Sequence, residues 1–93
     1  MRRYDRIISL LEKKFPNSVL EVFDDSHLHA DHNPDAKLGG THFTIKIVSE
    51  KFININRIER HRMVMDILEK EFESGLHAAS LNLISSKEKF YQL

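Results

Sequence analysis

The chain has 93 residues, of which 41% are hydrophobic, and its 14 basic residues balance 14 acidic ones. This length provides for a single domain over residues 1–93, and the neutral balance excludes the overall electrostatic attraction that a nucleic-acid binder usually carries. The chain has six histidines and no cysteine, and the absence of cysteine excludes a disulfide framework and a four-cysteine iron-sulfur cluster held by this chain alone. No apolar run approaches the roughly 20 residues that span a bilayer, so we expect a cytoplasmic protein without membrane contact.

The first element is predicted to be an amphipathic helix that ends near Lys14. Pro16 stops it, because a proline disfavours the helical conformation of the residue before it. Its apolar residues recur at helical spacing: Tyr4, Ile7, Ile8, Leu11 and Phe15. A β-rich run over residues 19–23 then predicts the first strand.

Residues 24–40 are polar and without periodicity, which predicts a long loop, and long loops in a compact domain are usually functional or disordered. The second strand is predicted over residues 42–48, where Phe43, Ile45 and Ile47 alternate with polar residues. This alternation indicates one core face and one wet face.

Asn56 is predicted to cap a second helix, with Glu59 at the capping-box position. Its apolar stripe runs from Ile58 through Val64 and Leu68, and Gly75 provides a left-handed end, so this helix should be the longest. A third strand follows over residues 76–84, in which His77 has the parity of the core-facing leucines.

Residues 85–91 are predicted to form one or two final helical turns. The order is α-β-β-α-β-α. Two strands joined by a loop pair most simply in antiparallel fashion, whereas a strand-helix-strand unit favours a parallel crossover. We therefore expect an α+β fold with a mixed three-stranded sheet and the helices on one face.

The loop carries His27, His29 and His32, and alternate residues of an extended chain could share a metal ion. Solvated loop residues are the simpler interpretation. His77 opens a strand directly after a glycine turn, where a rigid backbone would position a ligand well. A histidine packed at the sheet end explains the same spacing, and His42, at a strand start beside Phe43, favours a structural role.

Arg57 and Arg60 are three residues apart on the second helix and share a face that could meet phosphates, and Arg62 lies close by. Acidic residues dominate the rest of that helix, which favours a solvated charged face. No nucleophile elbow, P-loop or dinucleotide glycine pattern is present in the sequence, and no acid-base set converges. We therefore expect a protein that is not an enzyme.

Four segments together resemble the BolA family: Glu21-Val-Phe-Asp-Asp-Ser-His-Leu-His29, Thr41-His-Phe-Thr-Ile-Lys-Ile-Val-Ser49, Arg60-His-Arg-Met63 and Leu76-His-Ala-Ala79. The similarity runs in order over nearly the whole chain. It implies a single BolA-like domain with a fold similar to a type II KH domain, which agrees with the element order predicted from periodicity.

The resemblance further implies a partnership with monothiol glutaredoxins in iron-sulfur cluster assembly, transfer or iron sensing. A [2Fe-2S] cluster would be bridged between the two proteins: the glutaredoxin and its glutathione give thiolates, and His77 gives nitrogen. His29 best matches the second ligand, from the loop, with His32 or His27 as substitutes. The isolated chain would carry no cofactor, and a homodimer is an alternative state of the free chain.

Asn54 stands where the family often has glycine, and asparagine tolerates a left-handed backbone, so the turn should survive. Two other hypotheses remain. One is a DNA-binding transcriptional regulator that uses Arg57, Arg60 and Arg62, although the sequence has no KH-type GXXG clamp. The other is a stand-alone zinc protein that uses the three loop histidines.

Overall fold

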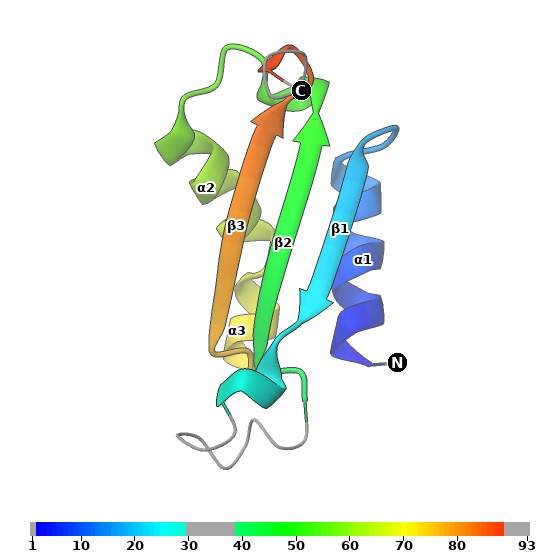
Figure 1. Cartoon of the computed structure of the whole chain (residues 1–93), viewed down its shortest axis with the longest axis vertical. Coiled ribbons are helices and arrows are strands. Elements are labelled where there is room, and N and C mark those ends of the chain that lie inside the picture. The colour runs from blue at the N-terminus through cyan, green and yellow to red at the C-terminus, as the bar shows by residue number, and fades with distance from the viewer. Residues whose placement is uncertain (1, 30–38, 89–93) are drawn as a thin grey trace.

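A computed structural model describes residues 2–29 and 39–88 of the chain. Three α-helices, three strands and two short 3₁₀ turns make up this part (Figure 1). In chain order they are α1 (Arg3–Lys14), β1 (Val19–Asp24), η1 (Ser26–His29), β2 (His42–Ser49), η3 (Glu50–Phe52), α2 (Arg57–Ile67), α3 (Glu69–Glu73) and β3 (Ala78–Ser85).

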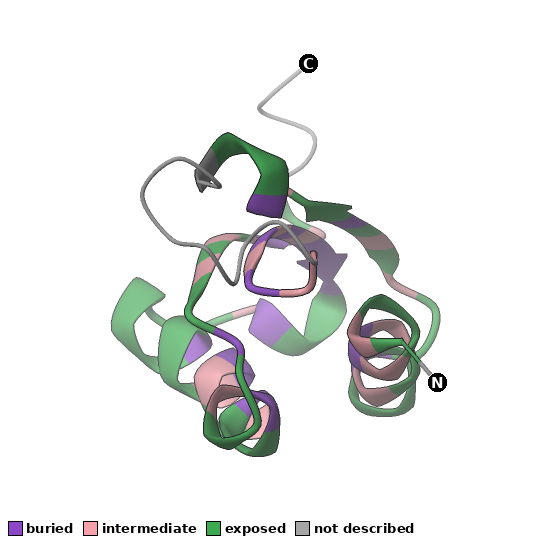
Figure 2. Cartoon of the chain, turned by 90° about the horizontal axis from the view of Figure 1, so that it is seen from below, coloured by how far each residue is buried: buried purple, intermediate pink, exposed green. Residues whose placement is uncertain are grey.

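The sheet has the order β1-β2-β3, with β1 antiparallel and β3 parallel to β2. Figure 2 shows the helices gathered on one side of the sheet. The predicted α+β class, with a mixed three-stranded sheet covered on one face, is therefore confirmed. Ser85 accepts a hydrogen bond from the backbone N–H of Glu88, as expected of a cap, and the rest of the predicted final helix lies outside the described residues.

The core lies between the helices and the inner face of the sheet. Phe43, Ile45 and Ile47 of β2 are buried there, which confirms the predicted alternation. Side chains from α1 and its C-cap and from the α2–α3 segment meet them: Ile7, Leu11, Phe15, Val64 and Leu68. The uncovered face of β2 presents half-buried polar residues, so the sheet has one dry face and one wet face.

The second helix differs from its prediction in two respects. It is divided at Leu68 into α2 and α3, because the N–H of Glu71 bonds to Leu68 O across three residues and tightens the turn. With 12 residues, α1 is therefore the longest single helix, against 11 in α2. Ile58 was predicted to join the apolar stripe but lies in the first turn, 70% exposed.

Both ends of this helical segment follow the predicted chemistry. Asn56 caps α2 by accepting a hydrogen bond from the N–H of Glu59, at 2.9 Å. The carboxylate of Glu59 instead accepts from Arg62, so the capping box is only half formed. Gly75 has a φ of +124°, and the N–H of Leu76 bonds back to Glu71 O, which closes the helix end.

Within residues 2–29 and 39–88, no helix has the length and apolar character needed to cross a membrane.

Candidate functional site

Three histidine positions lie at one end of the sheet, which we call the histidine end and define by His27, His42 and His77. His42 is the first residue of β2, His77 directly precedes β3, and His27 lies on η1. In Figure 1 this is the lower end, where β1 ends and where β2 and β3 begin. The parallel pairing of β2 with β3 sets His42 opposite Ala78, the residue after His77. This register brings His42 and His77 close together although they are 35 positions apart in the chain.

His77 has an exposed side chain, and its backbone is held in place by hydrogen bonds. Its N–H donates to the carbonyl of Thr41 at 2.8 Å, and the N–H of Ala78 donates to the same oxygen at 3.1 Å. The prediction that His77 enters the strand on its core-facing side is wrong, because His77 is exposed. The strand begins only at Ala78, and Leu76 is the residue that turns inward, at 3% exposure.

The imidazole of His42 lies against that of His77. Their ring centroids are 5.8 Å apart, and the ring planes are inclined by 61° in an edge-to-face arrangement. Nδ1 of His42 lies 2.8 Å from the hydroxyl oxygen of Thr41. Sequence reasoning gave His42 a structural role and missed this pair; only the strand register, which depends on pairing across the whole sheet, would have revealed it.

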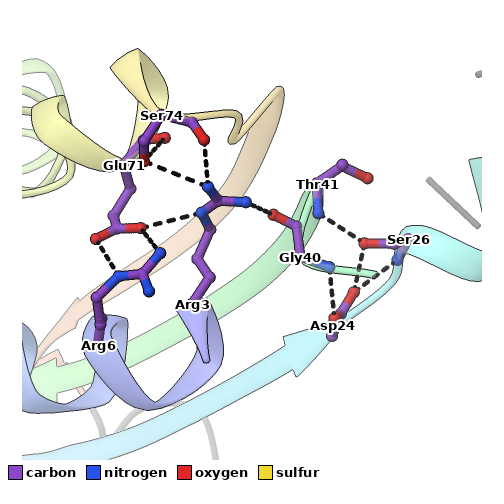
Figure 3. A network of polar contacts seen from close by, with 8 residues as sticks. All are labelled: Arg3, Arg6, Asp24, Ser26, Gly40, Thr41, Glu71 and Ser74. Carbon is purple, nitrogen blue, oxygen red and sulfur yellow. Dashed lines mark hydrogen bonds and ion pairs between the residues drawn. The ribbon is translucent and has the colours of Figure 1, made fainter. Parts of the chain in front are cut away.

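A set of short polar contacts holds the start of β2 (Figure 3). The hydroxyl of Ser26 donates to Asp24 at 2.5 Å and accepts from the N–H of Thr41 at 2.9 Å and that of His42 at 3.1 Å. The other carboxylate oxygen of Asp24 accepts from the N–H of Gly40 at 2.9 Å. Ser26 and Thr41 are both buried, whereas Asp24 is exposed and Gly40 is half-buried, so this polar frame beneath the histidine end is only partly shielded from water.

The charge of Asp24 is supported by this frame. Burial alone would raise the pKa of its carboxyl. Hydrogen bonds from the hydroxyl and N–H of Ser26 and from the N–H of Gly40 together outweigh this effect, so the pKa of Asp24 is lowered. Asp24 therefore stays an acceptor over the physiological pH range. As a result η1, whose first residue is Ser26, is fixed to the start of β2.

A second network ties α1 to the same end (Figure 3). Arg3 donates to Glu71 at 3.0 Å, to the carbonyl of Gly40 at 2.5 Å and to the carbonyl of Ser74 at 2.7 Å. Arg6 donates to both carboxylate oxygens of Glu71, at 3.0 and 2.9 Å. Hydrogen bonding from Arg6 is the largest influence on the pKa of Glu71 and, with Arg3, lowers it against the opposing effect of burial.

Arg3 passes close to two glycines that precede the two histidines. A Cβ placed on Gly40 would lie 3.3 Å from its guanidinium, and one on Gly75 would lie 3.2 Å from it. Both glycines have positive φ angles, +76° and +124°. One guanidinium therefore fixes the chain just before β2 and just before β3.

The loop histidines are described only in part. His27 is exposed on η1; the backbone of His29 belongs to the same turn, but its side chain lies outside the described residues, as does the whole of His32. Within the described part of the chain, no three histidine, aspartate or glutamate side chains are grouped so that they could hold a metal ion. His77, exposed at the start of β3, could offer one nitrogen ligand, which leaves the other ligands to the loop and to a partner.

The three arginines predicted for phosphates have different surroundings. Arg60 is buried, donates to the carbonyls of Ile55 and Leu83 at 2.7 and 3.1 Å and pairs with Glu88 at 2.6 Å. Arg60 and Arg57 both line a pocket of about 360 Å³ beside β3, as their spacing predicted, but the Arg60 guanidinium is occupied by its partners within the fold. Arg62 is exposed and pairs with Glu59 at 2.8 Å.

Arg57 lines a groove of about 390 Å³ between α2 and the edge of β3. The groove also contains Ile58 and His61 from the helix and Leu81, Asn82 and Leu83 from the strand. It combines one cation with an aliphatic floor. It is separate from the histidine end, since its strand residues begin three positions into β3.

Comparisons with known proteins agree over most of the chain. A family model described as BolA-like protein matches residues 11–88. The chain is 38% identical over 92 residues to the UV-induced protein uvi31 of Schizosaccharomyces pombe, covering 94% of this chain and 86% of that protein. It is 31% identical over 78 residues to the DNA-binding transcriptional regulator BolA of Haemophilus influenzae, covering 84% of this chain and 72% of that protein.

The fold has a counterpart among solved structures. The BolA domain of SufE1 from Arabidopsis thaliana superimposes with a TM-score of 0.83 at 41% identity, over 92% of this chain and 94% of that one.

Proposed function

The chain belongs to the BolA family, and from that premise we propose that it is a non-enzymatic adaptor that docks on a monothiol glutaredoxin and co-ligates a [2Fe-2S] cluster. His77 would be one ligand and His29 the second, with His27 or His32 as substitutes. The thiolates would come from the glutaredoxin and its glutathione, because this chain has no cysteine.

The observation that supports this proposal is the exposed imidazole of His77 on a backbone fixed by two hydrogen bonds to Thr41. A ligand shared between two proteins must be accessible and also held in place. The donor types fit the group: imidazole nitrogen can replace cysteine on one iron of a [2Fe-2S] centre, and such ligation raises the reduction potential. A chain with histidines alone would complete a cluster that a partner carries.

The test is to mix the chain with a glutaredoxin loaded with cluster and to record visible absorption and circular dichroism. We expect a spectrum distinct from that of the glutaredoxin alone, and its loss in His77→Ala. His61→Ala is the matched control, because His61 lies in the groove between α2 and β3. An unchanged cluster spectrum in His77→Ala would refute the assignment of His77 as a cluster ligand.

A second candidate function is binding of nucleic acid, which the groove favours. Arg57 has an aliphatic floor beside it, and the Haemophilus influenzae relative is named a DNA-binding transcriptional regulator. Affinity for duplex DNA should then fall with rising salt, and Arg57→Ala should lower the salt slope by about one. Absence of binding at low salt would remove this candidate.

A further inference from the structure

We propose that His42 is a positioning residue for His77: its ring, oriented by Thr41, sets the direction in which the His77 imidazole presents its metal-binding nitrogen. The inference rests on the proposed function of His77 as a ligand. It concerns a residue that sequence reasoning assigned to structure alone, and it gives that residue a measurable effect on the bound metal.

The first step is the contact between the two rings. With centroids 5.8 Å apart and planes inclined by 61°, the rings are within the range of an edge-to-face pair. His77 is exposed at the start of the strand next to β2. A neighbouring ring on the next strand removes part of the rotational freedom that an exposed imidazole would otherwise have.

The second step is the orientation of His42 itself. The hydroxyl of Thr41 lies 2.8 Å from its Nδ1, and a hydrogen bond at one ring nitrogen fixes the ring and selects its tautomer. Thr41 is 5% exposed, and its N–H is held by Ser26. The residue whose hydroxyl orients His42 is therefore itself buried and held at its backbone.

The third step is that Thr41 acts on both histidines. Its carbonyl accepts the N–H of His77 at 2.8 Å, while its hydroxyl contacts the ring of His42. One buried residue thus sets the backbone of the proposed ligand and the side chain of the neighbour that confines it. Partners that hydrogen-bond to a ligating imidazole change metal affinity by about 10- to 100-fold when removed, and for the ring contact we expect an effect at the lower end of that range.

Three variants separate positioning from ligation and from folding. His42→Ala removes the ring, His42→Phe keeps an aromatic ring without nitrogen, and Thr41→Val removes the hydroxyl while the backbone carbonyl stays. All three are checked for an unchanged urea midpoint. His61→Ala is the control for loss of a histidine elsewhere.

The first measurement needs no partner. Three-bond couplings and ring shifts of His77 are recorded by NMR in the isolated chain at pH 8. We expect one χ1 rotamer in the wild type and in His42→Phe, and averaging between rotamers in His42→Ala. A single rotamer retained in His42→Ala would overturn the proposal.

The second measurement follows loss of the cluster from the mixed complex with a glutaredoxin, by its visible absorption, together with its electron paramagnetic resonance after reduction. We expect His42→Ala to lose the cluster about tenfold faster with shifted g-values, His42→Phe to stay within about twofold, and Thr41→Val to fall between them. Loss of the cluster in His42→Phe as complete as in His77→Ala would show that His42 is a ligand and would overturn the positioning role.

The two failures can be told apart. If the wild-type chain forms no mixed cluster but His42→Ala still averages the His77 rotamer, then the proposed function fails while the confinement of the ring stands. If the cluster forms and is unaffected by His42→Ala, the proposed function stands and this inference fails.

Discussion

Replacement of Glu71 by glutamine should destabilise the protein through the two arginines that the carboxylate holds. Glu71 accepts three hydrogen bonds, one from Arg3 and two from Arg6, at 2.9 to 3.0 Å. The side chain of Glu71 is only 8% exposed and that of Arg3 14%, whereas Arg6 is 39% exposed. The variant therefore leaves one poorly solvated guanidinium without its counter-charge and one that water can still reach.

The size of the effect follows from this burial. Breaking a buried ion pair by removing one partner costs about 3 to 5 kcal/mol, and the exposure of Arg6 places Glu71→Gln at the lower end, about 3 kcal/mol. With an m-value of about 1.5 kcal/mol/M for a domain of this size, the urea midpoint should fall by about 2 M. Because Arg3 also binds the carbonyls of Gly40 and Ser74, amide signals of those residues should shift as well.

The assay is urea unfolding at pH 7, followed by circular dichroism. Glu59→Gln is the matched control, because Glu59 makes an exposed pair with Arg62 whose loss should cost no more than about 0.5 kcal/mol. If Glu71→Gln changes the midpoint no more than Glu59→Gln does, the reasoning that joins burial of this carboxylate to stability is refuted.

Three further predictions concern stability. The folded-state pKa values of Glu71 and Asp24 lie below the ordinary values of 4.5 and 3.8. The stability that these carboxylates contribute is therefore complete above the ordinary pKa values and is lost as the pH falls through the lowered folded-state pKa values. In Glu71→Gln the urea midpoint should consequently depend less steeply on pH on the acid side. Gly75→Ala should cost about 2 kcal/mol by calorimetry, since its φ of +124° strains any side chain and the new Cβ would meet Arg3; an unchanged melting temperature would contradict this. Arg60→Lys should cost about 2 kcal/mol through lost bonds to buried carbonyls and Arg62→Lys under about 0.5, and equal urea midpoints would argue against the structural role of Arg60.

Local patterns predicted most of the fold. The alternation of Phe43, Ile45 and Ile47 depends on a period of two that any strand must have, and all three are buried. Asn56 caps α2 as its position before the apolar stripe indicated. Asn54 has a φ of +64°, the left-handed conformation expected for that turn.

The site could be predicted only in part, because its contacts join distant segments. The pairing of His42 with His77 depends on strand register, which no local pattern contains. The position of Arg60 within a charged helix predicted an exposed side chain. Its guanidinium is instead buried, where it donates hydrogen bonds to the carbonyls of Ile55 and Leu83. The spacing rules that describe one helix or strand contain no information about such acceptors.

The network that holds the histidine end also has a consequence for the order of folding. Arg3 bonds to Glu71 across 68 positions and to Ser74 across 71, and contacts at such separation form late because loop closure must precede them. At synthesis rates of about 5 to 20 residues per second, α1 waits roughly 3 to 14 s for Glu71 to be made. During that interval His42 and His77 have no common frame, so a nascent chain cannot present them as a pair, and a metal centre offered by a partner would meet an organised surface only on finished molecules.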